Sequence, residues 1–266
     1  MVMSKRSKQW KSAAAKRLLS LAGNSATVED AVQIVANEAI RDIPHPPLHL
    51  EALAERLNVT RISYEEIPFS GELRPSNGGF AIVCSVHLSP TRRRFTIAHE
   101  LSHAIFEKSG RNCPRTGTEL ERLCDMLATE LLMPRQAFLE RCGTDPDINT
   151  IFDLARTFQT SVTTTAIRCA ELLRLSVFQV QDGSVVWSHG AIRKGPLHGL
   201  DDHLRMLISD GIAGGSGEEL LPLNLRGIVK YWQVRYRGTK GRVLFLMRPD
   251  RSHLSATTLN GSPTTR

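Results

Sequence analysis

Apolar residues recur at helical spacing through much of the first two thirds of the chain. Between residues 27 and 40, Ala31 and Val35 lie on one helix face together with their apolar neighbours. Thr27, with Asp30 three residues further on, is a typical N-cap for this helix. The same spacing predicts further helices, which we place at residues 50–59, 91–108, 119–133, 148–159 and 162–175.

Two parts of the chain are rich in β-branched and aromatic residues and predict strands. The first part comprises residues 60–67 and 80–88, with a turn expected at 74–79. The second part begins at residue 176, where two alternating runs flank Asp182-Gly183, a strong signal for a two-residue hairpin. A helix over 199–212 and a second hairpin over 227–249 are expected to follow. The chain therefore predicts an α+β fold with a β-rich C-terminal region.

Positive charge is concentrated at the start of the chain. The formal net charge is +7, and residues 1–20 supply six of these charges because they contain six lysines and arginines and no acid. We expect residues 1–26 to form a flexible basic tail, either solvated or in contact with nucleic acid or an acidic partner. Residues 251–266 are rich in Ser, Thr, Gly and Pro and are expected to be disordered.

The composition argues against a membrane protein and against a disulfide-stabilised one. No run of about 18 apolar residues is present, so no membrane span is expected. The five cysteines are odd in number and form no CxxC pair. This favours reduced thiols and a cytoplasmic location.

The helix expected at 91–108 has the strongest chemical signal. His99 and His103 are four residues apart and share one helix face, and Glu100 follows the first histidine. In this HExxH pattern the two imidazoles hold Zn²⁺ and the glutamate acts as general base on the attacking water. The alternative is a structural helix whose histidines make ordinary hydrogen bonds. Small and apolar neighbours favour the zinc site, since they allow the helix to be buried on its other face.

A catalytic zinc site needs a third protein ligand, and the following helix offers candidates. Glu121 and Asp125 are also four residues apart and share a face. We predict that Glu121 is the third ligand and that Asp125 accepts an N–H from a ligating histidine, which would fix its tautomer. Glu119 is the competing ligand, but it lies on a different face from Asp125.

These two segments resemble the ImmA/IrrE family of metallopeptidases. The family's Arg-x-Arg-Phe-Thr-x-Ala-His-Glu-Leu-Gly-His helix is similar to RRRFTIAHELSHAIFE at 92–107. The helix that follows in the family, Glu-x-x-Ala-Asn/Asp-x-Phe-Ala-x-x-Leu-Leu-Met-Pro, is similar to ELERLCDMLATELLMP at 119–134. Ser102, Cys124 and Leu127 depart from the pattern, and none of them removes a catalytic atom.

The resemblance covers residues 47–175 and implies a domain division. A thermolysin-like zinc peptidase core with a small sheet would occupy 27–145, followed by a helix-turn-helix-like segment over 146–175. Residues 176–250 would form a β-rich domain of unknown role. The resemblance also implies a cytoplasmic endopeptidase. Its substrate would be a protein regulator, such as a DNA-binding repressor of stress, prophage or mobile-element genes.

Two other functions compete with the peptidase. Residues 154–169 have helix-turn-helix spacing, which would suit a DNA-binding regulator that uses the zinc fold as a scaffold. However, Gln159 stands where the turn usually has Gly, and the second helix offers few cations, Arg168 and Arg174. The other alternative is a protein-interaction module. An intact Glu100 argues against both, since a scaffold does not need the base.

Substrate binding by the peptidase would need a free strand edge beside the zinc helix. We expect the strand at 79–88 to be that edge, because it directly precedes the helix. An extended substrate would then bind as an added strand.

Overall fold

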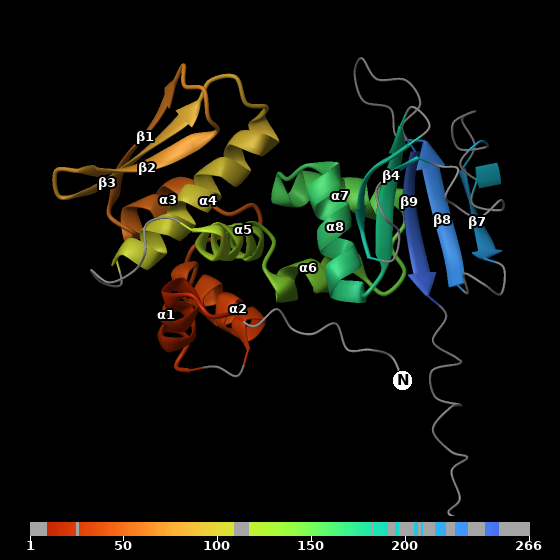
Figure 1. Cartoon of the computed structure of the whole chain (residues 1–266), viewed down its shortest axis with the longest axis horizontal. Helices are drawn as coiled ribbons and strands as arrows, with labels where there is room; N and C mark the ends of the chain where they lie inside the picture. The colour runs from red at the N-terminus through yellow and green to blue at the C-terminus, as the bar shows by residue number, and fades with distance from the viewer. Residues whose placement is uncertain are drawn as a thin grey trace, which may run out of the picture. The chain divides into compact units, whose positions relative to one another are not determined.

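The computed structural model describes residues 10–24, 27–108, 117–181, 184–190, 195–196, 205–206, 209, 216–221, 227–233 and 243–249. It has two compact units. The first comprises the chain up to Gly143 together with Thr150–Thr165, and the second comprises Thr144–Asn149 and the chain from Ala166 onward. Helices and strands occur in both units, so the expected α+β class is confirmed (Figure 1).

The first unit contains a three-stranded sheet in the order β1-β3-β2. The strands are β1 (Val59–Glu65), β2 (Gly71–Ser76) and β3 (Gly79–Ser85). β1 runs parallel to β3, and β2 and β3 form an antiparallel hairpin (Figure 1). β3 is the central strand, with β1 on one side and β2 on the other, so the expectation that residues 79–88 form a sheet edge is wrong. The edge strand beside the zinc-motif helix, residues 90–108, is β2.

The sequence pattern missed β2, and Pro75 shows why. The turn expected at 74–79 begins only after Ser76, with Gly78 at a φ of 83°. Pro75 is paired with Phe80, whose own N–H is directed toward the β1 side and donates to the Asn58 carbonyl at 2.8 Å. At such a position the backbone N–H of β2 would point away from β3. A proline costs no ladder hydrogen bond there.

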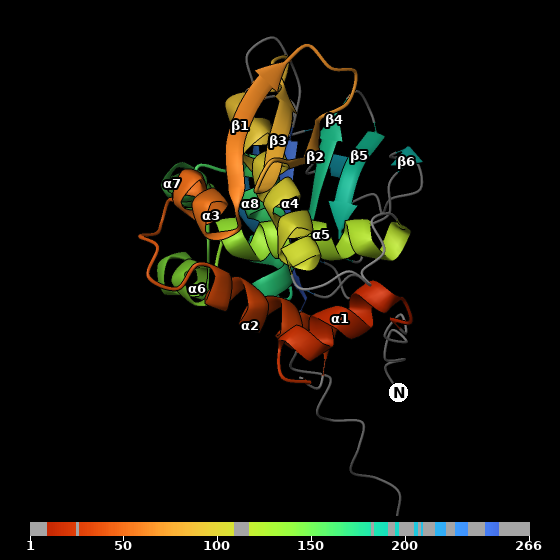
Figure 2. The same ribbon diagram turned by 90° about the vertical axis from the view of Figure 1, so that its left-hand side faces the viewer.

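Five of the six helices from α2 to α7 match predicted positions. The six helices are α2 (Val28–Ala39), α3 (Leu50–Arg56), α4 (Pro90–Lys108), α5 (Thr118–Leu132), α6 (Arg135–Cys142) and α7 (Ile148–Phe158). Thr27 caps α2 as expected, since its Oγ1 accepts from the Asp30 N–H at 3.1 Å. The sequence analysis did not predict α6, which buries Phe138 completely. α4 packs against β2, β3 and α5, and this contact builds the site described below (Figure 2).

The described part of the N-terminal segment, residues 10–24, differs from the flexible tail expected over residues 1–26, of which 1–9 and 25–26 lie outside the described residues. Residues Ala13–Leu21 form a helix, α1, which begins at an N-cap, Ser12, whose Oγ accepts from Ala15 N–H. Ala14, Ala15 and Leu18 lie on one face of α1 and are completely buried. α1 packs against α2, α4 and α5. In the sequence, the lysines and arginines that flank these residues mask the apolar face.

The second unit contains a six-stranded antiparallel sheet in the order β6-β5-β4-β9-β8-β7. Its strands are β4 (Ser176–Gln181), β5 (Ser184–His189), β6 (Gly195–Pro196), β7 (Ser216–Leu221), β8 (Gly227–Gln233) and β9 (Val243–Pro249). The predicted pairings β4–β5 and β8–β9 are confirmed. Both hairpin turns, most of the helix expected at 199–212 and the tail 251–266 lie outside the described residues.

The last helix of the chain's helical part, α8 (Val162–Leu173), matches its predicted position after a turn at 159–161. None of the helices in the part of the chain that the structure describes is long and apolar enough to cross a membrane.

Candidate metal centre

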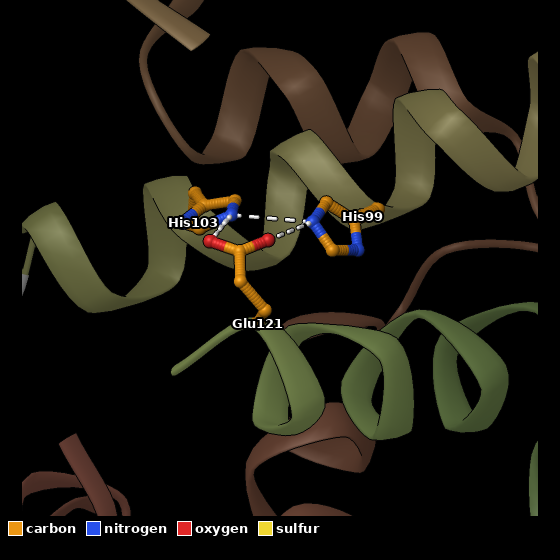
Figure 3. Close-up of side chains that lie close together, drawn as sticks. All are labelled: His99, His103 and Glu121. Carbon is orange, nitrogen blue, oxygen red and sulfur yellow. Dashed lines mark hydrogen bonds and ion pairs between the residues drawn. The ribbon is translucent and has the colours of Figure 1, made fainter. Parts of the chain in front are cut away.

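α4 places both histidines of the HExxH pattern at one surface. The opposite face of this helix is packed inside the unit, where Ala98, Leu101 and Ala104 are completely buried. His99 and His103 are one turn apart and lean toward the neighbouring helix α5 (Figure 3). Their imidazole rings meet edge to face with centroids 5.0 Å apart. The burial of the back of α4 therefore fixes where the two imidazoles point.

Glu121, in the first turns of α5, completes a group of three possible metal ligands. His99 Nε2 lies 3.2 Å from His103 Nε2 and 3.2 Å from Glu121 Oε2. The other oxygen of Glu121 lies 3.6 Å from His103 Nε2. One ligand atom from each residue lies within 4.8 Å of the others.

These separations fit a zinc ion. Tetrahedral bonds of about 2.0–2.1 Å put two ligand atoms about 3.3 Å apart. Two imidazoles and one carboxylate form a ligand set that catalytic zinc sites use. The spacing in this cluster matches that requirement without rearrangement of either helix.

Asp125 lies one turn beyond Glu121 and contacts the far side of the His99 ring. Its Oδ1 is 2.9 Å from His99 Nδ1. A carboxylate at this distance favours the tautomer in which Nδ1–H donates to Asp125. The lone pair of Nε2 is then directed toward His103 and Glu121.

The two histidines differ in their affinity for protons. Burial lowers the pKa of His99, but the hydrogen bond to Asp125 and the nearby carboxylates outweigh it, so the pKa is raised overall. Burial and the charge of His99 lower the pKa of His103. In the metal-free pair His99 therefore keeps a proton to higher pH than His103 does. A metal ion at this cluster would compete with a proton for His99 Nε2.

Glu100 is the second residue of the motif and is turned toward β2. Its side chain is only 8% exposed, and burial raises the pKa of its carboxyl group. The charge of His99 and a hydrogen bond from the Leu73 N–H oppose this rise. Since Leu73 is in the edge strand β2, the sheet edge and the carboxylate are in direct contact. The sequence held no sign of this contact, because β2 itself was missed.

A cleft of about 440 Å³ lies between β2 and this face of α4. Gly71, Leu73 and Pro75 line it from the strand side. His99, Glu100, His103 and Glu121 line it from the helix side. The cluster and the carboxylate of Glu100 therefore face one shared space in which a peptide could lie.

Glu119, the competing ligand, is not part of the cluster. Its Oε2 accepts the backbone N–H of Ser12 at 3.0 Å and that of Lys11 at 3.3 Å. Hydrogen bonds from Ser12 hold the pKa of this carboxyl below its usual value. Glu119 thus faces the N-terminal segment, in keeping with its helical position two residues from Glu121.

Comparison with known proteins identifies the class. Residues 68–170 match the model of a peptidase-type family, the IrrE N-terminal-like domain. This segment contains His99, Glu100, His103, Glu121 and Asp125. The match at residues 68–170 supports the resemblance to the ImmA/IrrE family that the two motifs predicted.

One solved structure with a similar fold is that of a Mycobacterium tuberculosis transcriptional regulator. The two share 14% sequence identity with a TM-score of 0.53, over 88% of this chain and 80% of that chain. At this identity the likeness concerns the fold alone. The chain has no significant match among curated protein sequences.

Proposed function

We propose that the protein is a zinc-dependent endopeptidase that hydrolyses a peptide bond in a protein partner. The observation that carries this proposal is the cluster of His99, His103 and Glu121, with Glu100 in the same cleft. Three protein ligands and an open position are typical of catalytic zinc sites, whereas structural sites use four protein ligands. The match of residues 68–170 to a peptidase-type family model supports the same function.

Each residue of the site has its own role in this proposal. His99, His103 and Glu121 hold Zn²⁺, and Asp125 orients the His99 ring by accepting from Nδ1. When bound, zinc polarises the scissile carbonyl and makes water a stronger nucleophile. Glu100 takes a proton from the attacking water and delivers it to the leaving amine. Its raised pKa makes the carboxylate a stronger base toward the attacking water.

The substrate binds as a strand added to the outer edge of β2, in the thermolysin-like manner. In an antiparallel pair the backbone groups of alternate residues point away from the partner strand. The Leu73 N–H bonds to Glu100, so the backbone groups of Leu73 point away from β3. Gly71 and Pro75 lie two residues before and after Leu73, so their backbone groups point the same way. Their carbonyl groups can accept from an extended peptide, which then passes over His99 and Glu100. Backbone pairing of this kind demands little of the substrate side chains.

The partner is a transcriptional repressor or a similar regulator of stress, prophage or mobile-element genes. Support comes from the resemblance to the ImmA/IrrE family, in which such regulators are substrates. A cytoplasmic location would bring the enzyme and a DNA-binding partner together. It also fits Cys84, Cys124, Cys142 and Cys169, which are buried and form no disulfide among the described residues.

The test of this function is a Glu100→Gln variant assayed for zinc and for cleavage. Glutamine keeps the shape of the side chain but cannot accept the proton. The variant should keep its zinc while peptide hydrolysis falls by about 10²–10⁴-fold or more. Zinc is measured by metal analysis of protein purified without chelator, and hydrolysis with a library of extended peptides.

Three further variants, at His99, Glu121 and Glu140, complete the test. His99→Ala should lose both zinc and cleavage. Glu140→Gln, which changes an exposed carboxylate on α6, should keep both. Wild-type turnover by Glu100→Gln would contradict the mechanism. Full zinc occupancy in His99→Ala and in Glu121→Ala would contradict the ligand set.

One observation favours a second candidate, a DNA-binding regulator. Gln159, in the turn between α7 and α8, has a φ of 52°, the left-handed conformation that glycine usually supplies in a helix-turn-helix. The Ser161 Oγ accepts from the Thr164 N–H and caps α8. The backbone of this turn therefore suits the motif. The side chains of α8 do not, because Arg168 is only 7% exposed.

A further inference from the structure

The first turn of α5 holds Glu121, and among the described residues the N-cap position of this helix provides no side-chain cap. Its N-cap position is Gly117, at a φ of 143°, and this residue makes no side-chain cap hydrogen bond. The first turn of an uncapped helix tends to fray. Glu121 lies in that first turn, so its position over the two histidines needs support from elsewhere.

The N-terminal segment supplies two contacts at this point. The Glu119 Oε2 accepts both the Ser12 N–H at 3.0 Å and the Lys11 N–H at 3.3 Å. Three residues further along α5, the guanidinium of Arg122 lies 4.5 Å from the centroid of the Trp10 ring. Both contacts involve neighbours of Glu121 and join α5 to residues more than 100 positions earlier in the chain.

α1 is fixed to the first unit by its own buried face, so its contacts can hold the start of α5 in place. Its buried residues Ala14, Ala15 and Leu18 hold it to the first unit, where it packs against α2, α4 and α5. The same α1 thus contacts the helix that holds both histidines and the helix that holds Glu121. A carboxylate that accepts two backbone N–H groups is also a stronger contact than an exposed ion pair.

We propose that Glu119 is a positioning residue for the metal site: it fixes the first turn of α5 on the N-terminal segment and so holds Glu121 at the two histidines. This assignment rests on the proposed function, because it requires that the cluster binds zinc. It also gives residues 10–21 a role in the site, although they lie outside the segment that matches the family model.

The test compares Glu119→Ala with Glu119→Gln in the full-length protein. Both changes remove the same negative charge near the metal site. Only glutamine keeps an oxygen that can accept from Ser12 and Lys11, which bond to a single carboxylate oxygen in the structure. The measured quantities are the zinc dissociation constant, obtained by competition with a chelator, and the Tm of the metal-free protein. Glu140→Ala, an exposed carboxylate on α6, is the matched control.

Loss of support behind a metal ligand typically weakens metal affinity by about 10–100-fold. We expect Glu119→Ala to weaken zinc binding by about 10-fold, and Glu119→Gln and Glu140→Ala to stay within about 2-fold of the wild type. Trp10→Ala should also weaken zinc binding, because it removes the second contact between the N-terminal segment and α5.

Three results would overturn the assignment. Equal weakening by Ala and Gln at position 119 would show an effect of charge and not of position. A lowered Tm with unchanged zinc affinity would show a contribution to stability alone. A wild-type chain that binds no zinc would overturn the proposed function as well, whereas the first two results leave that function intact.

Discussion

Gly71 lies where β2 comes closest to α4. A Cβ atom at this position would lie 2.5 Å from Thr96 Cγ2, 3.2 Å from the Val83 carbonyl oxygen and 3.6 Å from Glu100 Cγ. Only a residue without a side chain allows the strand to approach the helix this closely. The close approach in turn lets the Leu73 N–H reach the carboxylate of Glu100.

A Gly71→Ala variant should therefore lose peptidase activity while it keeps zinc. The added methyl group must push β2 away from Thr96, and a misplacement of about 1 Å at a reacting group can cost about 100-fold in rate. His99, His103 and Glu121 lie on other elements, so the zinc content should not change. Cleavage and zinc assays of the purified variant check this, with Ser76→Ala at the exposed end of β2 as control. Full activity of Gly71→Ala would show that the strand can shift freely.

Site residues that lie close together in the sequence, on one helix, could be predicted. Contacts between residues far apart in the sequence could not. His99, Glu100 and His103 follow one another on a single helix, and Glu121 and Asp125 follow one another on the next. Their relative positions depend only on helix geometry. The contacts of Glu119 with Ser12 and of Glu100 with Leu73 depend on tertiary packing. No pattern in the sequence records that packing.

At the scale of elements, the main difference between prediction and structure concerns the sheet beside the metal centre. α2, α4 and α5 have strong helical spacing and were found within a few residues of their bounds. β2 has only six residues and contains Gly71 and Pro75, which both indicate turns. The proline is accepted because its nitrogen points away from β3. The features that hid β2 are therefore those of an exposed edge strand.

A peptide that binds along β2 should show a two-residue pattern of sensitivity. An added strand offers alternate N–H groups to the outward carbonyls of β2, and the N–H groups between them face away. Methylation of the peptide nitrogen at alternate positions of a cleaved peptide should therefore reduce kcat/KM by about 10-fold or more per bond lost. Methylation at the intervening positions should have a small effect.

The measurement uses a series of singly N-methylated versions of one peptide that the wild-type protein is found to cleave. Zinc content is constant across the series because the protein is unchanged. Uniform sensitivity at all positions, or tolerance at all of them, would exclude strand addition on β2. In that case the substrate would be recognised through its side chains.

At the scale of the whole molecule, positive charge and the helix-turn-helix-like segment lie in different parts of the chain. Residues 1–20 supply six of the seven net charges. The helix α8 contributes Arg168, which is nearly buried and lies 4.0 Å from Glu171. A helix that reads the major groove must expose cations or amides to the bases. The charge distribution therefore favours non-specific attraction to nucleic acid over sequence recognition by α8.

The full-length protein should accordingly bind duplex DNA weakly and without sequence preference. Replacement of Lys5, Arg6 and Lys8 by Gln should abolish most of this binding, and each lost phosphate contact should reduce the slope of log K against log salt by about 0.9. Arg168→Gln should leave both the affinity and the slope unchanged. Titrations of labelled duplexes at several salt concentrations provide these values. Tight binding to one sequence that Arg168→Gln weakens selectively would instead support the DNA-binding regulator, with α8 as its recognition helix.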